Sequence, residues 1–185
     1  MNTDSKLKII NAKLVNEGNV FDGEILIVND RIYKIGSQIE VEGECEIYDA
    51  NGNYVLPGLI DDQVHFREPG LTHKATIATE SKAALAGGIT SFIEMPNTLP
   101  QTTTIEEWET KNKRAADTSF ANYAFMFGGT NDNLEEILAL DTKRVPALKL
   151  FLGSSTGNML VDNPDVLRKI FSNTDLVIAV HCEDE

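Results

Sequence analysis

The chain has 185 residues, of which 42% are hydrophobic and 24% are charged, and its formal net charge is −13. This composition is typical of a globular protein with a buried core. The acidic balance argues against a nucleic-acid-binding protein, because such proteins need a basic surface to displace counterions. We therefore expect no nucleic-acid partner.

A membrane partner is not expected either. No apolar run approaches the roughly 18–20 residues that span a bilayer. The N-terminal segment MNTDSKLKII lacks the apolar stretch of a signal peptide. The two cysteines, Cys45 and Cys182, are far apart in the sequence, which fits two free thiols in a reducing compartment. These features together predict a cytoplasmic protein.

The first 56 residues are expected to form a small β unit of short strands and turns. Apolar and polar residues alternate clearly in EILIVNDRIYKIG, and Gly, Asn and Asp interrupt the pattern at intervals. This segment shows no helical periodicity. We therefore expect a separate β domain over residues 1–56 and a second domain over residues 57–185.

From about residue 57, apolar strand-like runs alternate with helical patterns. The runs are GLIDDQVHF, ITSFIEM, NYAFMFGG, ALKLFL and LVIAVH. Because these runs are almost continuously apolar, they indicate a parallel sheet buried on both faces. Capping residues and a terminal Gly-Gly place the intervening helices. The expected helices are Thr72–Ala86, 104–116, Asn133–Leu140 and one that begins at Asn163–Pro164.

A doubly wound sheet and a (β/α)8 barrel both fit this alternation. The polar residues favour the barrel, because barrel active sites lie at the C-terminal ends of the strands. Four candidate residues lie there: His65, Asn97, Lys149 and His181. A complete barrel needs eight strands and roughly 250 residues. We therefore expect an α/β fold in which residues 57–185 form about the first five βα units of a barrel, within a longer protein.

The segment DDQVHFREPG raises the question of a metal site. His65 and His181 each follow a buried strand, and either one alone would more often be a structural residue than a ligand. Two histidines at equivalent strand ends of a barrel converge on one mouth, which favours ligation. Gln63 stands two residues before His65, where a strand-borne site would normally carry its first histidine.

Lys149 lies inside the apolar strand ALKLFLG. Burying an ammonium group without a partner is costly, so its pKa should fall or the amine should be chemically altered. A neutral amine can react with carbon dioxide to form a carbamate, whose two oxygens can bridge two metal ions. The alternative is that Lys149 reaches solvent or pairs with an acid.

Arg67 and Asn97 are candidates for binding a small polar ligand. The planar guanidinium of Arg67 suits a carboxylate, although it could instead pair with Glu68. Asn97, in EMPNTLP, could bind a ligand or merely close a turn. The glycines of GGIT and FLGSSTGN do not form a phosphate-binding loop, because GxxxxGK[ST] is absent.

Four segments of the chain resemble the dihydroorotases of the amidohydrolase superfamily. They are VLPGLIDDQVHFREPGLTHK, GGITSFIEMPNTLP, LKLFLGSSTG and VIAVHCEDE. The earlier DGEILIVNDRIYKIG resembles the N-terminal β-sandwich segment of that superfamily, so the likeness extends from about residue 7 to the end. HFREPG together with MPNT is typical of dihydroorotases rather than of allantoinases or hydantoinases.

The resemblance implies metal-dependent hydrolysis of the cyclic amide of dihydroorotate to carbamoyl aspartate. This reaction is reversible and belongs to pyrimidine synthesis. The implied cofactors are one or two zinc ions and a CO2-derived carbamate on a lysine. The implied partners are this small-molecule substrate and a second copy of the chain in a homodimer.

The resemblance also implies roles for individual residues. Lys149 would carry the bridging carbamate, and Arg67 and Asn97 would bind the substrate carboxylate. The metal ligands would be His65, Lys149 and His181, with Gln63 as a further candidate. A third histidine and the general-base aspartate would lie beyond residue 185, so the chain by itself is expected to be inactive.

Gln63 departs from the family pattern. An amide oxygen is a weaker zinc ligand than imidazole, so the metal position served by the histidine pair should be weakened. One zinc ion is still sufficient to polarise a carbonyl and activate water. Two alternatives remain open: a non-catalytic, dihydroorotase-like scaffold subunit, and a related cyclic amidase acting on hydantoins or allantoin.

Overall fold

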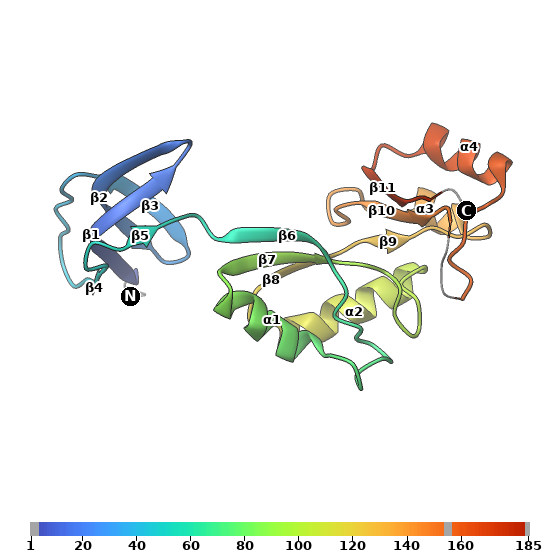
Figure 1. Cartoon of the computed structure of the whole chain (residues 1–185), viewed down its shortest axis with the longest axis horizontal. Helices are drawn as coiled ribbons and strands as arrows, with labels where there is room; N and C mark the ends of the chain where they lie inside the picture. Colours follow the sequence, from blue (N-terminus) through green and yellow to red (C-terminus); the bar gives the residue numbers. More distant parts are fainter. Residues whose placement is uncertain (1–3, 154–156, 184–185) are drawn as a thin grey trace. The chain divides into compact units, whose positions relative to one another are not determined.

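The computed structural model describes residues 4–153 and 157–183 of the chain. The chain divides into two compact units, Met1–Pro57 and Gly58–Glu185 (Figure 1). Within the described ranges, no helix combines the length and the apolar character that crossing a membrane would require.

The N-terminal unit is a mixed five-stranded sheet built around its first strand. The antiparallel part contains β1 (Lys6–Asn16), β2 (Asn19–Val28) and β3 (Arg31–Gly36), in the order β3-β2-β1. Two short strands, β4 (Glu46–Asp49) and β5 (Tyr54–Val55), both pair with β1 in parallel. Its small core consists of Ala12, Leu14, Ile25 and Ala50.

Residues with positive φ form the tight turns of this sheet. Glu17 and Gly18, between β1 and β2, have φ values of 49° and 75°. Two successive positive φ values are typical of the hairpin turns whose twist matches that of the strands. Asn29, with φ 56°, opens the turn between β2 and β3, and Asn adopts this conformation more readily than most residues.

The described residues of this unit do not form the β-sandwich that the resemblance implied. A sandwich requires a second sheet packed on the first. Here every strand belongs to one sheet, because β2, β4 and β5 all hydrogen-bond to β1 and β3 extends the sheet beyond β2. The strands expected between residues 6 and 56 are present, but they supply only one layer.

The second unit contains parallel strands arranged in chain order. The first sheet has the strand order β6-β7-β8, and the second has the strand order β9-β10-β11. The strands are β6 (Leu59–Val64), β7 (Ile89–Glu94), β8 (Asn122–Phe125), β9 (Phe127–Gly128), β10 (Leu148–Phe151) and β11 (Ile178–His181). This alternation of parallel strands and helices confirms the α/β class.

A single residue separates the two sheets of this unit. Met126 lies between β8 and β9, and its N–H donates to the carbonyl oxygen of Glu94 at 3.0 Å. The next N–H, that of Phe127, donates to the carbonyl oxygen of Ala147 at 3.1 Å. The expected strand NYAFMFGG is therefore divided at Met126: its first part, β8, pairs with β7, and its second part, β9, pairs with β10.

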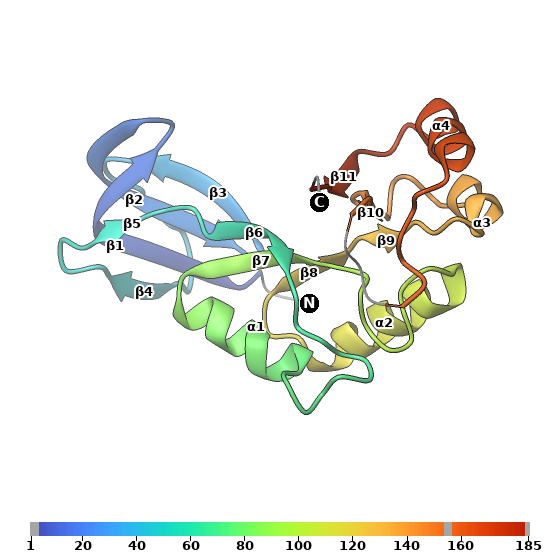
Figure 2. The same cartoon turned by 45° about the vertical axis from the view of Figure 1, so that its right-hand side comes forward.

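In the part of this unit that the structure describes, four helices connect these strands: α1 (Ile77–Ala86), α2 (Ile105–Thr118), α3 (Leu134–Leu138) and α4 (Pro164–Asn173). Helices α1 and α2 lie along the same side of the first sheet, and α3 lies against α4 (Figures 1 and 2). All four residues of β10 are buried. The burial of β10 agrees with the prediction of a parallel sheet buried on both faces, but β6 and β11 are exposed or half-buried and do not fit it.

The helix starts follow the predicted caps in two cases and differ in one. The side chains of Thr104 and Asn163 cap α2 and α4 by accepting backbone N–H groups of the first turn. The helix expected from Thr72 instead begins at Ile77, after the cap Thr76. The reason is local: residues 71–74 close a turn, and the buried Glu68 carboxylate accepts the Ile77 N–H at 2.8 Å.

Candidate functional site

His65, Asn97 and His181 lie at or just past the C-terminal ends of parallel strands, as predicted, whereas Lys149 lies inside its strand. His65 directly follows β6, and Asn97 comes three residues after β7. Lys149 is the second residue of β10, and His181 is the last residue of β11. Parallel strands present these ends at the same edge of a sheet, which is where α/β enzymes bind ligands.

The structure brings His65 and Asn97 together. Nδ1 of His65 lies 2.8 Å from Oδ1 of Asn97. An amide oxygen only accepts, so Nδ1 carries the hydrogen and the lone pair of Nε2 is available to a metal ion. Burial lowers the pKa of His65, and the hydrogen bond to Asn97 opposes this effect only in part. The neutral ring that results is the form that ligates metals.

Arg67 occupies a backbone conformation that is rare outside glycine. Its φ is 69°, and its backbone N–H donates to Oε1 of Glu94 at 3.1 Å. The alternative of an Arg67–Glu68 pair is not observed, since Glu68 binds Arg114 at 3.0 Å. Among the described residues, the guanidinium of Arg67 has no protein partner, which leaves its donors available to a ligand.

The loops after β6 and β7 are packed directly against each other. The N–H of Leu99 donates to the carbonyl oxygen of Pro69 at 3.1 Å. Gly70 has φ 80°, and a Cβ atom at this position would lie 1.9 Å from the carbonyl oxygen of Leu99. The glycine therefore permits a contact between the two backbones that fixes the loop of Arg67 relative to the loop of Asn97.

Lys149 is buried without a charged partner. Its exposed fraction is 3%, and its Nζ lies 5.2 Å from the ring centroid of Phe151. In the described ranges Nζ forms neither a hydrogen bond nor an ion pair, and burial lowers its pKa. The two alternatives considered for Lys149, reaching solvent or pairing with an acid, are therefore not observed, and a neutral amine is favoured.

His181 lies on the same face of the second sheet as Lys149. In the register of β10 and β11, His181 is opposite Phe151, two residues beyond Lys149, and the two rings are 6.1 Å apart. Residues two apart on a strand and directly opposite on its neighbour share a face. The exposed His181 also lies 3.3 Å from a carboxylate oxygen of Glu183.

The candidate ligand atoms of this site are of types that bind zinc. The hydrogen bond to Asn97 leaves one ring nitrogen of His65 free. Lys149 is a buried amine with no hydrogen bond or ion pair among the described residues, and carbamate formation would give it oxygen donor atoms. Gln63 is exposed at the end of β6. Within residues 4–153 and 157–183, no three His, Cys, Asp or Glu side chains are grouped closely enough to hold a metal ion.

One buried ion pair beside the site was not anticipated from the sequence. Glu94, at the end of β7, and Lys111, on α2, are 0% and 1% exposed, and their charged atoms are 2.9 Å apart. Two sequence features could have revealed it. Glu94 interrupts the apolar strand ITSFIEM, and Lys111 lies on the same helical face as Trp108 and Ala115, which are both buried.

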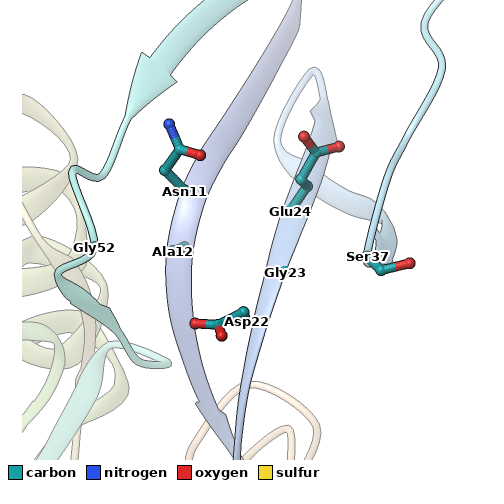
Figure 3. Close-up of a pocket in the computed structure, with 7 residues that line it drawn as sticks. All are labelled: Asn11, Ala12, Asp22, Gly23, Glu24, Ser37 and Gly52. Carbon is teal, nitrogen blue, oxygen red and sulfur yellow. The ribbon is translucent and has the colours of Figure 1, made fainter.

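A cavity of about 440 Å³ lies elsewhere, in the N-terminal unit (Figure 3). Its polar side chains come from Asn11 on β1, Asp22 and Glu24 on β2, and Ser37 just beyond β3. None of the residues expected to bind metal or substrate lines it. Its acids do not form a recognisable site, because Glu24 is already paired with Lys8 at 2.8 Å.

Comparison with curated proteins identifies clear relatives. The dihydroorotase of Methanosarcina acetivorans is 36% identical over 183 residues, which cover 97% of this chain and 39% of the relative. The dihydroorotase of Lactococcus lactis subsp. lactis is 40% identical over 185 residues, which cover 96% and 42%. The chain thus spans about two fifths of the length of these relatives.

Comparison with solved structures identifies cyclic amide hydrolases. L-hydantoinase (dihydropyrimidinase) from Arthrobacter aurescens aligns with a TM-score of 0.90 and 28% identity, covering 99% of this chain and 42% of that one. D-hydantoinase (dihydropyrimidinase) from Thermus sp. aligns with a TM-score of 0.77 and 29% identity, covering 96% and 40%.

The family comparison agrees with these relatives. The model of the dihydro-orotase-like family matches residues 52–185, which include β6 to β11 and every candidate site residue. The match therefore covers most of the chain, and the motif-based resemblance to dihydroorotases is confirmed. The chain belongs to the dihydro-orotase-like family.

Proposed function

We propose that the full-length protein is a zinc-dependent dihydroorotase that interconverts dihydroorotate and carbamoyl aspartate. The observation that carries this proposal is the arrangement of Arg67 beside the hydrogen-bonded pair of His65 and Asn97. A free guanidinium next to a candidate metal ligand suits a cyclic amide that bears a carboxylate. The curated relatives named dihydroorotase support the same substrate.

We propose that the whole protein completes the two partial structures. The parallel strands β6 to β11 would be the first part of a (β/α)8 barrel. The sheet of residues 1–56 would be one layer of a β-sandwich. The structural similarity to hydantoinases along almost the whole chain supports this arrangement.

The metal ligands in this proposal are His65, Lys149 as a carbamate, and His181, with Gln63 as a further candidate. Zinc, when bound, would polarise the ring carbonyl of the substrate and activate water. To form the carbamate, neutral Nζ of Lys149 would attack the carbon of carbon dioxide; a C–N bond would form as one C=O π pair moves to oxygen, and the N–H proton would pass to a water molecule. The burial that lowers the pKa of Lys149 favours this reaction.

The remaining residues would bind and orient the substrate. The guanidinium of Arg67 would donate two parallel N–H groups to the substrate carboxylate. Asn97 would donate from Nδ2, because its Oδ1 already accepts from His65. These contacts would hold the ring carbonyl in a fixed position for attack, which reduces the entropy loss of the reaction. The third histidine and the general-base aspartate are expected outside residues 1–185.

Two other functions are each supported by one observation. Solved structures similar to the chain include hydantoinases, which favours a cyclic amidase for substrates without a carboxylate. Gln63, in place of a histidine, favours a non-catalytic scaffold subunit. A scaffold would not need Arg67, Asn97 and the buried Lys149 together, so the dihydroorotase proposal accounts for more of the site.

A substrate comparison with the full-length protein and its Arg67→Ala variant tests the proposal. Dihydroorotate, dihydrouracil, hydantoin and allantoin would be assayed side by side. We expect hydrolysis of dihydroorotate, and a loss of about 100-fold in kcat/KM on removing the bidentate contact of Arg67, equivalent to about 3 kcal/mol. Preference for a ring without a carboxylate, or an unchanged kcat/KM in the variant, would contradict it.

The setting of the protein is also part of the proposal. We propose a cytoplasmic homodimer whose partner is the small-molecule substrate, without a nucleic-acid or membrane partner. The acidic composition, with a net charge of −13, supports the absence of a nucleic-acid partner. Sedimentation of the full-length protein would measure its oligomeric state.

A further inference from the structure

Glu94 and Lys111 form a buried ion pair directly behind the candidate site. Nζ of Lys111 lies 2.9 Å from Oε2 of Glu94, and both side chains are almost completely excluded from solvent. Nζ also donates to the carbonyl oxygen of Met95 at 3.1 Å and lies over the ring of Phe125. Buried ion pairs rarely add net stability compared with apolar residues of similar size. This pair therefore calls for another explanation.

The other oxygen of Glu94 contacts the backbone of Arg67. Oε1 accepts the Arg67 N–H at 3.1 Å. Arg67 has φ 69°, a conformation that costs a non-glycine residue on the order of 1–2 kcal/mol. The surroundings must hold such a residue in place, and Glu94 provides a charged acceptor for its N–H.

The position of Glu94 in the chain links this contact to the second ligand-binding residue. Glu94 is the last residue of β7, and Asn97 follows it by three residues in the adjoining loop. Lys111, on α2, forms the ion pair with Glu94 and donates a hydrogen bond to the carbonyl oxygen of Met95. One buried pair thus fixes the start of the loop of Asn97 and, through Oε1, the backbone of Arg67.

We propose that Glu94 is a positioning residue that holds Arg67 in register with Asn97 for binding the substrate carboxylate, and that Lys111 balances its buried charge. This inference rests on the proposed function, because it assigns Glu94 a role in the substrate binding suggested for Arg67. It extends that function to two residues outside the expected metal and substrate ligands. It also explains why a buried acid and base are placed where apolar residues would suffice.

Two double variants of the full-length protein separate positioning from simple structural support. Glu94→Gln with Lys111→Met removes both charges and keeps an oxygen that can accept the Arg67 N–H. Glu94→Leu with Lys111→Met removes both charges and that acceptor. Single variants are less suitable, because each would leave an unpaired buried charge. The thermal midpoint of each double variant reports its folding.

The expected result is a KM effect confined to the variant without the acceptor. The double variant Glu94→Leu with Lys111→Met should raise the KM for dihydroorotate on the order of tenfold, with kcat changed by less than about threefold. The double variant Glu94→Gln with Lys111→Met should retain a KM near that of the wild type. Equal KM values in the two double variants would overturn the inference, as would a loss confined to kcat.

Hydrogen exchange at the Arg67 amide gives an independent measurement. We expect slow exchange of the Arg67 amide hydrogen in the wild type and faster exchange in the double variant Glu94→Leu with Lys111→Met. Rapid exchange in the wild type would overturn the inference, even if a double variant failed to fold. If the wild type does not hydrolyse dihydroorotate, the proposed function fails and this inference fails with it. If the wild type is active and the two variants behave alike, only this inference fails.

Discussion

Burial changes the chemistry of individual side chains at this site. Lys149 is enclosed by β10 and its neighbours, and because no acid pairs with it in the described residues, burial lowers its pKa toward the neutral amine. His65 is kept neutral for the same reason, while Asn97 sets which ring nitrogen carries the hydrogen. In both residues burial shifts the pKa toward the neutral form, which carbamate formation and metal ligation would require.

Changing Gln63 to histidine should strengthen metal binding. In the full-length protein, Gln63→His would supply an imidazole two residues before His65, in place of a weaker amide ligand. We expect zinc affinity to rise by at least about tenfold, or about 1.4 kcal/mol. Zinc counted after dialysis against graded chelator concentrations measures it. Gln63→Asn is the matched control, and a Gln63→His protein with unchanged zinc affinity would show that this position does not ligate.

Glu24 should stabilise the N-terminal sheet in a pH-dependent way. Its carboxylate pairs with Lys8 at 2.8 Å and accepts the Ile39 N–H at 2.6 Å. The hydrogen bond from Lys8 is the main reason that the pKa of Glu24 is lowered. Because the folded pKa lies below the unfolded one, this stabilisation is complete at neutral pH and is lost as pH falls through the folded pKa.

The test is urea unfolding of Glu24→Gln in the full-length protein (Figure 3 shows the position of Glu24). At pH 7 the variant should unfold with about 1 kcal/mol less free energy than the wild type. The difference should shrink as pH falls through the lowered pKa of Glu24, because the wild-type carboxyl then becomes protonated and resembles the amide. Glu40→Gln, at an exposed position, is the control. A difference that persists unchanged to low pH would refute the role of the charge.

The loops that follow β6 and β7 bring His65, Arg67 and Asn97 together. The loop after β6 is fixed to the loop after β7 by the Leu99–Pro69 hydrogen bond and by the close approach at Gly70. On its other side, Glu68 connects the first loop to the start of α1 and to Arg114 on α2. The geometry of Arg67 is therefore a property of several elements at once.

A side chain at Gly70 should separate these loops. Gly70→Ala in the full-length protein should cost more than about 3 kcal/mol of unfolding free energy, because its Cβ would overlap the Leu99 carbonyl oxygen. Gly88→Ala is the matched control: its φ is also positive, at 87°, but nothing lies within 4 Å of its Cβ. We expect that control to cost only about 1–2 kcal/mol. Equal costs in denaturant unfolding would show that the loop contact is unimportant.

Periodicity and caps predicted the elements well, but not their exact bounds or partners. Thr104 and Asn163 were correctly expected to cap helices, because side-chain capping is local in sequence. The start of α1 at Ile77 was missed because it depends on Glu68, nine residues earlier, whose carboxylate accepts the Ile77 N–H. The change of strand partner at Met126 depends on Glu94 and Ala147, which no local pattern reveals.

Part of the candidate site could likewise be predicted from the sequence. The lysine in an apolar strand indicated a buried amine with a lowered pKa, and Lys149 has both properties. The His65–Asn97 hydrogen bond and the Glu94–Lys111 pair could not be derived in the same way. Each joins residues that are distant in sequence and meet only when the strands pair. Whether His181 and Lys149 share a metal with His65 stays a prediction.

For the whole molecule, the candidate site residues all lie in one of the two units. Gly58–Glu185 contains every candidate ligand, on its parallel strands or in the loops that follow them. Met1–Pro57 contributes a separate sheet with its own small core. The curated relatives are more than twice as long as the matched segment, so the complete catalytic centre is proposed for the full-length protein only.

The most direct test of the account is the hydrolysis of dihydroorotate by the full-length protein, with bound zinc counted in the same sample. We predict turnover that requires zinc, with one or two zinc ions per chain, and loss of turnover when a chelator removes the metal. Turnover with zinc would mean that Gln63 is a tolerated substitution within a working site. No turnover at any zinc loading would contradict the account and favour the non-catalytic scaffold.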